Sequence, residues 1–329
     1  MQVVKRQLQA RGWGARLSFA AVLLVCSEWI IWQRPTTYSP LEWLGIGIVY
    51  VALAAATLDL IARLRVRDLA RLLLLAGLYG LANGTLIAHI TARDLPVSLL
   101  GRPLGAQPLA FVLALALFQV LSSGRATGPL DFIAALATGA SWGIWVRWFP
   151  VVSDERVPAA SSDEAIIALA ALLLGCAALH YALSAGSPDH HRTWLLRRGE
   201  ALLVSAVLGA TLLFGLAQGA LQEADVAILA GLGGFLAIVL LLSAPIDERP
   251  SLLRHMMPPR RPNLAGWLLV VVPFLIAGWA GYHLPGEGTS SPQSNLLFGG
   301  LTLFGLLWPP VTAGLIGVRV LARLTREGW

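Results

Sequence analysis

Five polar residues lie inside or at the ends of long apolar stretches, where ionisable and amide side chains are costly and are therefore candidates for function. Glu28 is followed by Trp29 and Ile30 and has no cation beside it in the sequence. A carboxylate that shares a membrane depth with histidines and an arginine could bind an anionic or protonatable substrate, or relay protons. We therefore predict an outward-facing polar site, formed by Glu28, Asn83, His89, Arg147 and His283.

A structural role competes with this interpretation of Glu28. Ionisable groups in a membrane also pair to stabilise a fold, and Arg147 is the cation expected at a similar depth. Such a pair would hold Glu28 ionised, whereas a partner such as His89 or Asn83 would leave it able to exchange a proton. In either case we expect Glu28 to face the interior of the helix bundle, within hydrogen-bonding reach of a polar group from another helix.

Other patterns give weaker signals for chemistry. The run 189–192, Asp-His-His-Arg, has two adjacent histidines, which lack the spacing and the number of ligands that a metal site needs. His89 and His283 are the only histidine pair expected at one depth, and nothing else points to a haem. The chain has no GxSxG, HExxH, P-loop or dinucleotide-binding pattern. We expect no metal and no cofactor, and the balance favours a protein that is not an enzyme.

Composition places these residues in a membrane. Of the 329 residues, 57% are hydrophobic and only 13% are charged, against about 25% charged in an ordinary soluble domain. The net charge of +6 comes from cations scattered in short loops, which argues against a nucleic-acid-binding face. Lys5 is the only lysine, so no intramembrane lysine is present to form a retinal Schiff base. One transmembrane domain over 1–329 is the simplest organisation.

Apolar runs of membrane-crossing length recur along the whole chain and predict an all-α bundle of about ten transmembrane helices. Several of these runs begin at helix-capping patterns, in which a polar side chain binds the first free backbone N–H groups. The patterns are Ser39 with Glu42, Gly128 with Asp131, Ser161 with Glu164, Asn263 and Asn295. The predicted spans are 17–33, 42–62, 72–91, 107–123, 129–149, 164–184, 200–221, 225–244, 264–282 and 296–320.

The loops between these spans predict the orientation, because cytoplasmic loops retain Lys and Arg. With both termini in the cytoplasm, inner segments hold 19 of the 24 cations, and Arg34, Arg93, Arg102, Arg147 and Arg156 are the outer ones. We therefore expect a multi-pass protein of the cell membrane, in a bacterial inner membrane. The tryptophans expected in an outer aromatic belt are Trp32, Trp43, Trp145, Trp148 and Trp279, and His180 is expected at the inner interface.

Small residues four apart predict where helices approach closely. The pairs are Gly80 with Gly84, Gly139 with Gly143, and Gly215 with Gly219, so their spans should be interior. Prolines lie within the last two spans, at Pro273 and at 309–310, where a proline usually kinks a helix. Asp59 is expected to pair with Arg63 one turn later.

These features fit three classes of function. The first is a secondary transporter or permease for a small molecule, because of the ten spans, the short loops and the buried carboxylate. The second is an intramembrane enzyme that acts on a lipid or a lipid-linked substrate through the outer polar cluster. The third is a non-catalytic membrane subunit of a larger complex. The expected partners are the lipid bilayer, a small-molecule substrate and other membrane subunits, without nucleic acid.

Overall fold

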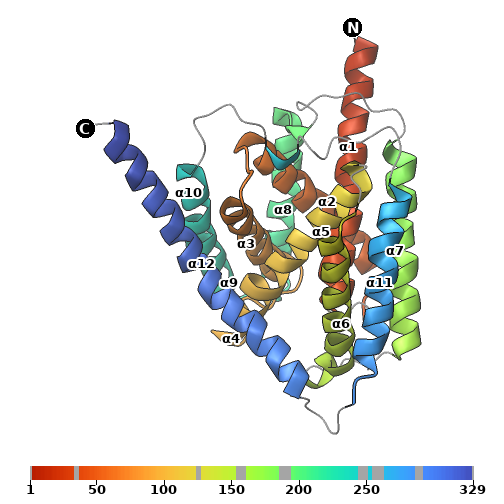
Figure 1. The fold of residues 1–329 in the computed structure, drawn as a ribbon. Helices are drawn as coiled ribbons and strands as arrows, with labels where there is room; N and C mark the ends of the chain where they lie inside the picture. The colour runs from red at the N-terminus through yellow and green to blue at the C-terminus, as the bar shows by residue number, and fades with distance from the viewer. Residues whose placement is uncertain are drawn as a thin grey trace. The chain divides into compact units, whose positions relative to one another are not determined.

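The computed structural model describes residues 2–32, 37–123, 127–152, 161–184, 194–243, 251–253, 263–285 and 292–327. Every regular element in these residues is helical (Figure 1). Ten helical stretches are long and apolar enough to cross a membrane, which agrees with the number expected from the sequence. The chain therefore has the composition and helix lengths of a multi-pass membrane protein.

The chain forms two compact units, each built from three separate stretches of sequence. Unit 1 consists of Met1–Tyr50, Leu113–Thr193 and His255–Gly299. Unit 2 consists of Val51–Val112, Trp194–Arg254 and Gly300–Trp329. Three helices contribute to both units: α2 (Pro40–Arg63), α5 (Gln107–Ser123) and α12 (Pro292–Glu327).

Unit 1 contains α1 (Gln2–Leu24), α6 (Pro129–Val152), α7 (Ser162–Ser184) and α11 (Leu264–Tyr282). The first of these continues into a π-helical turn, η1 (Val25–Ile30). Close packing of α6 on α11 is possible because glycines face backbone. A Cβ at Gly139 would meet the backbone of Phe274, and one at Gly143 would meet that of Gly278. This glycine pair confirms the predicted close approach of the fifth span to another helix.

Unit 2 contains α3 (Leu69–Leu86), α4 (Val97–Gly101), the π-turn η2 (Arg102–Ala106) and α8 (Arg198–Ala217). One continuous helical stretch follows, formed by α9 (Glu223–Ile228), the π-turn η4 (Leu229–Gly233) and α10 (Gly234–Leu242). Packing of α3 against η2 confirms the glycine pair of the third span. A Cβ at Gly80 would strike the Pro103 carbonyl oxygen, and one at Gly84 would lie 2.6 Å from Pro103 Cγ.

The third glycine pair was interpreted wrongly. Gly215 is next to Leu221 of the segment that follows its own helix, and Gly219 has no neighbour near its missing side chain. Instead, Gly219 adopts a φ of 67° after the last residue of α8, where a left-handed residue ends a helix. Only Val204 and Gly215 of α8 are buried, so this span is not interior.

Helix starts follow the sequence signals with one exception. Ser39 and Glu42 exchange the two hydrogen bonds of a capping box, as do Ser161 and Glu164. Asn263 accepts from the backbone N–H of Gly266, as expected of a cap. The exception is Asn295, which lies inside α12 because that helix already begins at Pro292.

Three span boundaries differ from the expected ones by five residues or more, and one of them is the start of the first span, at Gly12 instead of residue 17. The third span ends at Leu86 instead of residue 91, and the fourth begins at Val97 instead of residue 107. The sequence around Pro103 looks like a loop, but the π-turn η2 accommodates the proline and keeps the chain helical. The helices α11 and α12 also continue through their internal prolines without a break.

Candidate functional site

Glu28 lies on the π-turn η1, near the end of the first candidate span. The wide turn is marked by a hydrogen bond from Ile31 N to Cys26 O of 3.3 Å, between residues five apart. Turns of this kind interrupt helices rarely and are frequent at functional sites. Glu28 therefore occupies an irregular turn, which hydropathy did not indicate.

The Glu28 side chain is fully buried, with 0% exposure, and its two oxygens differ. Oε1 accepts a hydrogen bond of 2.6 Å from the Tyr50 hydroxyl, which belongs to α2. Oε2 is buried and has no hydrogen-bond partner among the described residues. The expectation that Glu28 faces the interior and meets a polar group of another helix is confirmed. Its partner Tyr50 was not anticipated.

Two tryptophans of α6 hold the end of the π-turn. Trp142 Nε1 donates to the Trp29 carbonyl oxygen over 3.0 Å, and Trp145 Nε1 donates to that of Ile31. The last carbonyl groups of any helix lack partners within it, so these indoles supply the missing donors. Both tryptophans are buried. Their spacing of three residues on one helix face thus serves to fix the segment that carries Glu28.

Trp32 closes this segment in a left-handed conformation, with a φ of 56°. Its ring lies edge-on to Trp29 at 5.8 Å, and the side chain is 1% exposed. The aromatic-belt assignment was wrong for Trp32, Trp145 and Trp148, all of which are buried. Trp279 is 51% exposed, as a residue of a belt would be.

Arg147 and His283 lie together at the end of α11, with partners other than Glu28. Arg147 Nη1 donates to the carbonyl oxygens of Tyr282 and Leu284 at 3.0 and 2.7 Å. The His283 ring lies 4.8 Å from that of Trp279. The alternative of an ion pair between Glu28 and Arg147 is therefore wrong, because each group bonds elsewhere.

Asn83 and His89 belong to unit 2. Asn83 Nδ2 donates to the Tyr79 hydroxyl over 3.3 Å, within α3. His89 is half-buried in the loop after α3, outside the candidate spans, and has a φ of 50°. Burial lowers the pKa of His89, because it disfavours the charged ring, while the Asp225 carboxylate acts in the opposite direction. The five candidates are thus divided between two units, and within each unit they have separate partners.

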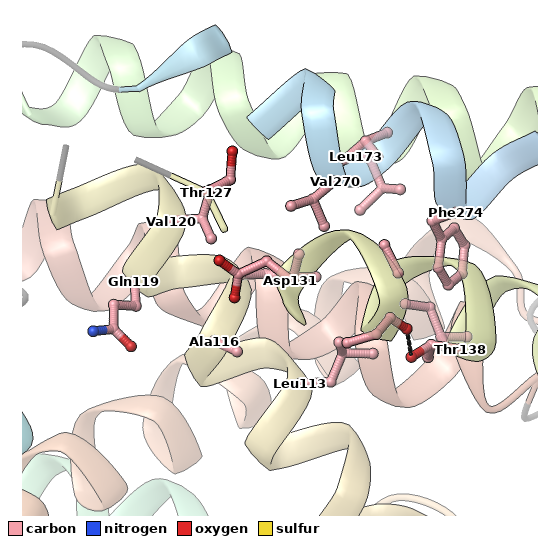
Figure 2. Close-up of a pocket in the computed structure, with 15 residues that line it drawn as sticks. Leu113, Ala116, Gln119, Val120, Thr127, Asp131, Thr138, Leu173, Val270 and Phe274 are labelled. Atoms are coloured by element: carbon pink, nitrogen blue, oxygen red, sulfur yellow. Dashed lines mark hydrogen bonds between the residues drawn. The ribbon is translucent and has the colours of Figure 1, made fainter. Parts of the chain in front are cut away.

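Unit 1 also contains a pocket of about 130 Å³ that the sequence analysis missed (Figure 2). Helices α5, α6, α7 and α11 line it, together with Ile30 at the end of the π-turn. Polar side chains lie on its α5 and α6 walls, including Gln119, Asp131 and Thr138. A signal was present, because Asp131, Ala134, Ala135 and Thr138 share one face of α6 by their spacing. It was hidden by the capping role of Asp131, whose Oδ2 accepts from Gly128 N over 2.8 Å.

One buried hydrogen bond joins a serine to a histidine, the pair used in nucleophilic catalysis. Ser18 Oγ and His180 Nδ1 are 2.7 Å apart. Both side chains are buried, and Phe118 packs edge-on against the histidine ring at 5.7 Å. A substrate carbonyl has no access to the hydroxyl, so this bond ties α1 to α7. His180 was expected at the inner interface, but it is buried between helices.

No protein-family model, no curated protein and no solved structure matches this chain.

Proposed function

We propose that this protein is a secondary transporter for a small molecule, and that Glu28 gains and loses a proton during transport. The observation that carries the proposal is the asymmetry of the Glu28 carboxyl group. One oxygen is held by Tyr50, and the other is buried without a partner in the part of the chain that the structure describes, on an irregular turn of a candidate membrane span. A secondary transporter needs a buried group whose bonding can change between states, and ionisable residues in spans are the usual choice.

The surroundings of Glu28 support exchange of a proton or ligand at Oε2. A buried polar atom without a partner is costly, so an added proton, a water molecule or a polar ligand group would stabilise it. The rest of the segment is held firmly, because Trp142 and Trp145 bind its backbone carbonyl groups. Among the described residues of this segment, Glu28 Oε2 and Trp32 Nε1 are buried side-chain atoms without a hydrogen-bond partner, and of the two only Glu28 Oε2 can accept a proton. An intramembrane enzyme receives less support, since Ser18 and His180 are packed beyond the reach of a substrate.

The proposal includes an orientation and a location. We place both termini in the cytoplasm and the protein in a bacterial inner membrane, because 19 of the 24 cations fall in the segments assigned to that side. Reporter fusions after Arg67, between α2 and α3, should give a cytoplasmic signal. Fusions after Asp94, in the loop before α4, should give an external one. The reverse pair of signals would contradict this orientation.

The functional test compares two glutamates in proteoliposomes that contain a pH-sensitive dye. Glu28→Gln removes the titratable group and keeps an acceptor for Tyr50. Glu42→Gln is the matched control, because Glu42 is exposed and its capping role can be taken over by glutamine. Gradients of organic cations, organic anions and neutral solutes are applied in turn.

We expect one solute class to drive proton movement in the wild type and in Glu42→Gln, and none to do so in Glu28→Gln. A Glu28→Gln protein that elutes as a single species and still moves protons would overturn the role of Glu28. A wild type in which none of the three classes moves protons would overturn the transporter itself.

A further inference from the structure

The pocket of unit 1 is matched in size to a single ring or a short branched alkyl group. Its volume is about 130 Å³, and an engineered protein cavity of about 150 Å³ is known to accept benzene. Most of the wall is apolar, with Leu113, Leu117, Leu173, Val270 and Phe274 as its larger side chains. A ligand group of this size would therefore be held by dispersion contacts and by exclusion from water.

One charged side chain lines this pocket. Asp131 is half-buried in the first turn of α6, and its carboxylate points away from the helix among the other lining residues (Figure 2). Oδ2 is occupied by the backbone N–H of Gly128, and no cationic side chain of the described residues pairs with the carboxylate. Gln119 and Thr127 also line the pocket. An apolar pocket with a carboxylate with which no cation of the described residues pairs is complementary to a cation attached to an apolar body.

The pocket is in contact with the segment that carries Glu28. Ile30, two residues after Glu28, belongs to its wall. Phe274, another wall residue, packs at 5.7 Å against Trp142, whose indole holds the carbonyl of Trp29. A group that fills the pocket would therefore contact Ile30 of the π-turn and Phe274, which packs against Trp142. This gives a direct physical connection between occupancy of the pocket and the surroundings of Glu28.

We propose that this pocket binds an organic amine, with its ring or alkyl group in the apolar chamber and its ammonium group at Asp131. A lipid acyl chain would fit the apolar wall but would make no use of the carboxylate, and an organic anion would be repelled by it. The inference rests on the proposed function only in treating the amine as a transported substrate. Binding itself can be measured without transport.

The test uses thermal unfolding of the purified protein in detergent with two probes of nearly the same shape. 2-Phenylethylamine carries the ammonium group, and 2-phenylethanol is its neutral counterpart. We expect the amine to raise the unfolding temperature of the wild type more than the alcohol does. Asp131→Asn keeps the cap at Gly128 and should abolish this preference, by weakening amine binding about tenfold or more, as loss of a charged hydrogen bond does. Asp163→Asn, in the exposed first turn of α7, is the control and should leave it unchanged.

A second matched pair tests the chamber. Ala134 and Ala137 are both exposed residues of α6, but only Ala134 lines the pocket. Ala134→Phe should abolish the response to both probes, whereas Ala137→Phe should retain it. Equal responses to amine and alcohol in the wild type, or an undiminished preference in Asp131→Asn, would overturn the proposal.

Two further measurements separate the alternatives. A response to decanoate that Ala134→Phe removes, without a response to the amine, would assign the pocket to a lipid tail and overturn amine binding. Glu28→Gln should still bind 2-phenylethylamine, because Glu28 does not line the pocket. Amine binding in a protein that moves no protons would support the pocket as an amine site and contradict the proposed transport.

Discussion

The two units each contain a π-turn whose backbone is held by a tryptophan of another helix, yet the turns differ in what they carry. In unit 1, Trp142 binds the end of η1, and the turn bears Glu28. In unit 2, Trp308 Nε1 donates to the Leu104 carbonyl of η2 over 2.6 Å, and the turn is followed by Gln107. Gln107 is 0% exposed, and neither polar atom of its side chain has a partner among the described residues.

The packing around η1 also differs from the packing around η2. Glycines bring the backbone of α4 and η2 against their neighbours, with Gly80 at Pro103, Gly105 at Leu301, and Gly305 at Leu100. The turn η1 is instead next to aromatic rings, and its last residue, Ile30, lines the pocket. The same helical irregularity can therefore serve close packing in one place and display a titratable group in another. What distinguishes the two is the side chain on the turn and the space beside it.

The largest expected effect is at the packed turn of unit 2. Gly80→Ala would drive a methyl group into the Pro103 carbonyl oxygen, and overpacking of this kind costs about 1–3 kcal/mol. The unfolding temperature should fall sharply, or folded protein should not be recovered. Gly45→Ala is the control, because nothing lies within 4 Å of its added Cβ. If both alanine variants had the same stability, the close packing described for η2 would be incorrect.

Removal of the indole donor should affect function at one turn and only stability at the other. Trp142→Phe and Trp308→Phe each leave a backbone carbonyl without its donor, at a cost of about 1–3 kcal/mol. Both variants should be less stable in thermal unfolding. Only Trp142→Phe should also lower proton movement per folded molecule in proteoliposomes. An equal loss of proton movement in Trp308→Phe would remove the functional distinction between the turns.

Glu28, on η1, and Gln107, directly after η2, should respond in opposite ways to replacement by methionine. Gln107→Met replaces two unpaired buried polar atoms by an apolar chain of similar length, so stability should stay within about 1 kcal/mol or increase. Glu28→Met should abolish proton movement. Loss of activity in a stable Gln107→Met protein would show that unit 2 also contains a functional polar site, and the comparison would have to be redrawn.

The smallest effect is a pH dependence from His89 in unit 2. Burial lowers its pKa from the ordinary value of 6.5, so the unfolded chain binds the proton more readily than the folded one. The free energy of unfolding should therefore decrease as the pH falls below about 6.5 towards the lowered pKa. His89→Gln should flatten this dependence, whereas His283→Gln, at an exposed position, should not. A wild type whose stability rises in this range would contradict the assigned environment.

Much of the helical framework could be predicted from local sequence. Apolar runs located the ten candidate spans, and capping patterns such as Ser39 with Glu42 placed several of their starts. Asp59 pairs with Arg63 as expected from their spacing, and it also accepts from the backbone N–H of Leu196. Such features depend on residues a few positions apart, and so they are visible in the sequence itself.

The candidate site could be predicted only in part, because its geometry depends on contacts between distant segments. The burial of Glu28 could be predicted, but its partner Tyr50 follows 22 residues later on another helix. The π-turn could not be inferred, since the donors that hold it come from residues more than 110 positions away. For the same reason Arg147 was paired with the wrong group. Its actual acceptors are backbone carbonyls, which no sequence pattern distinguishes.

The contact between α6 and α11 has a mechanical consequence for the pocket that they help to line. Gly139, Gly143 and Gly281 bring the two backbones together without intervening side chains, at a distance where Cα–H groups can interact with carbonyl oxygens. Because their backbones are in close contact, α6 and α11 should resist sliding and separation and move as a rigid pair. A ligand cannot part them to reach the pocket. The pocket is instead accessible past Ala116 of α5 and Ala134 of α6, two wall residues that are exposed.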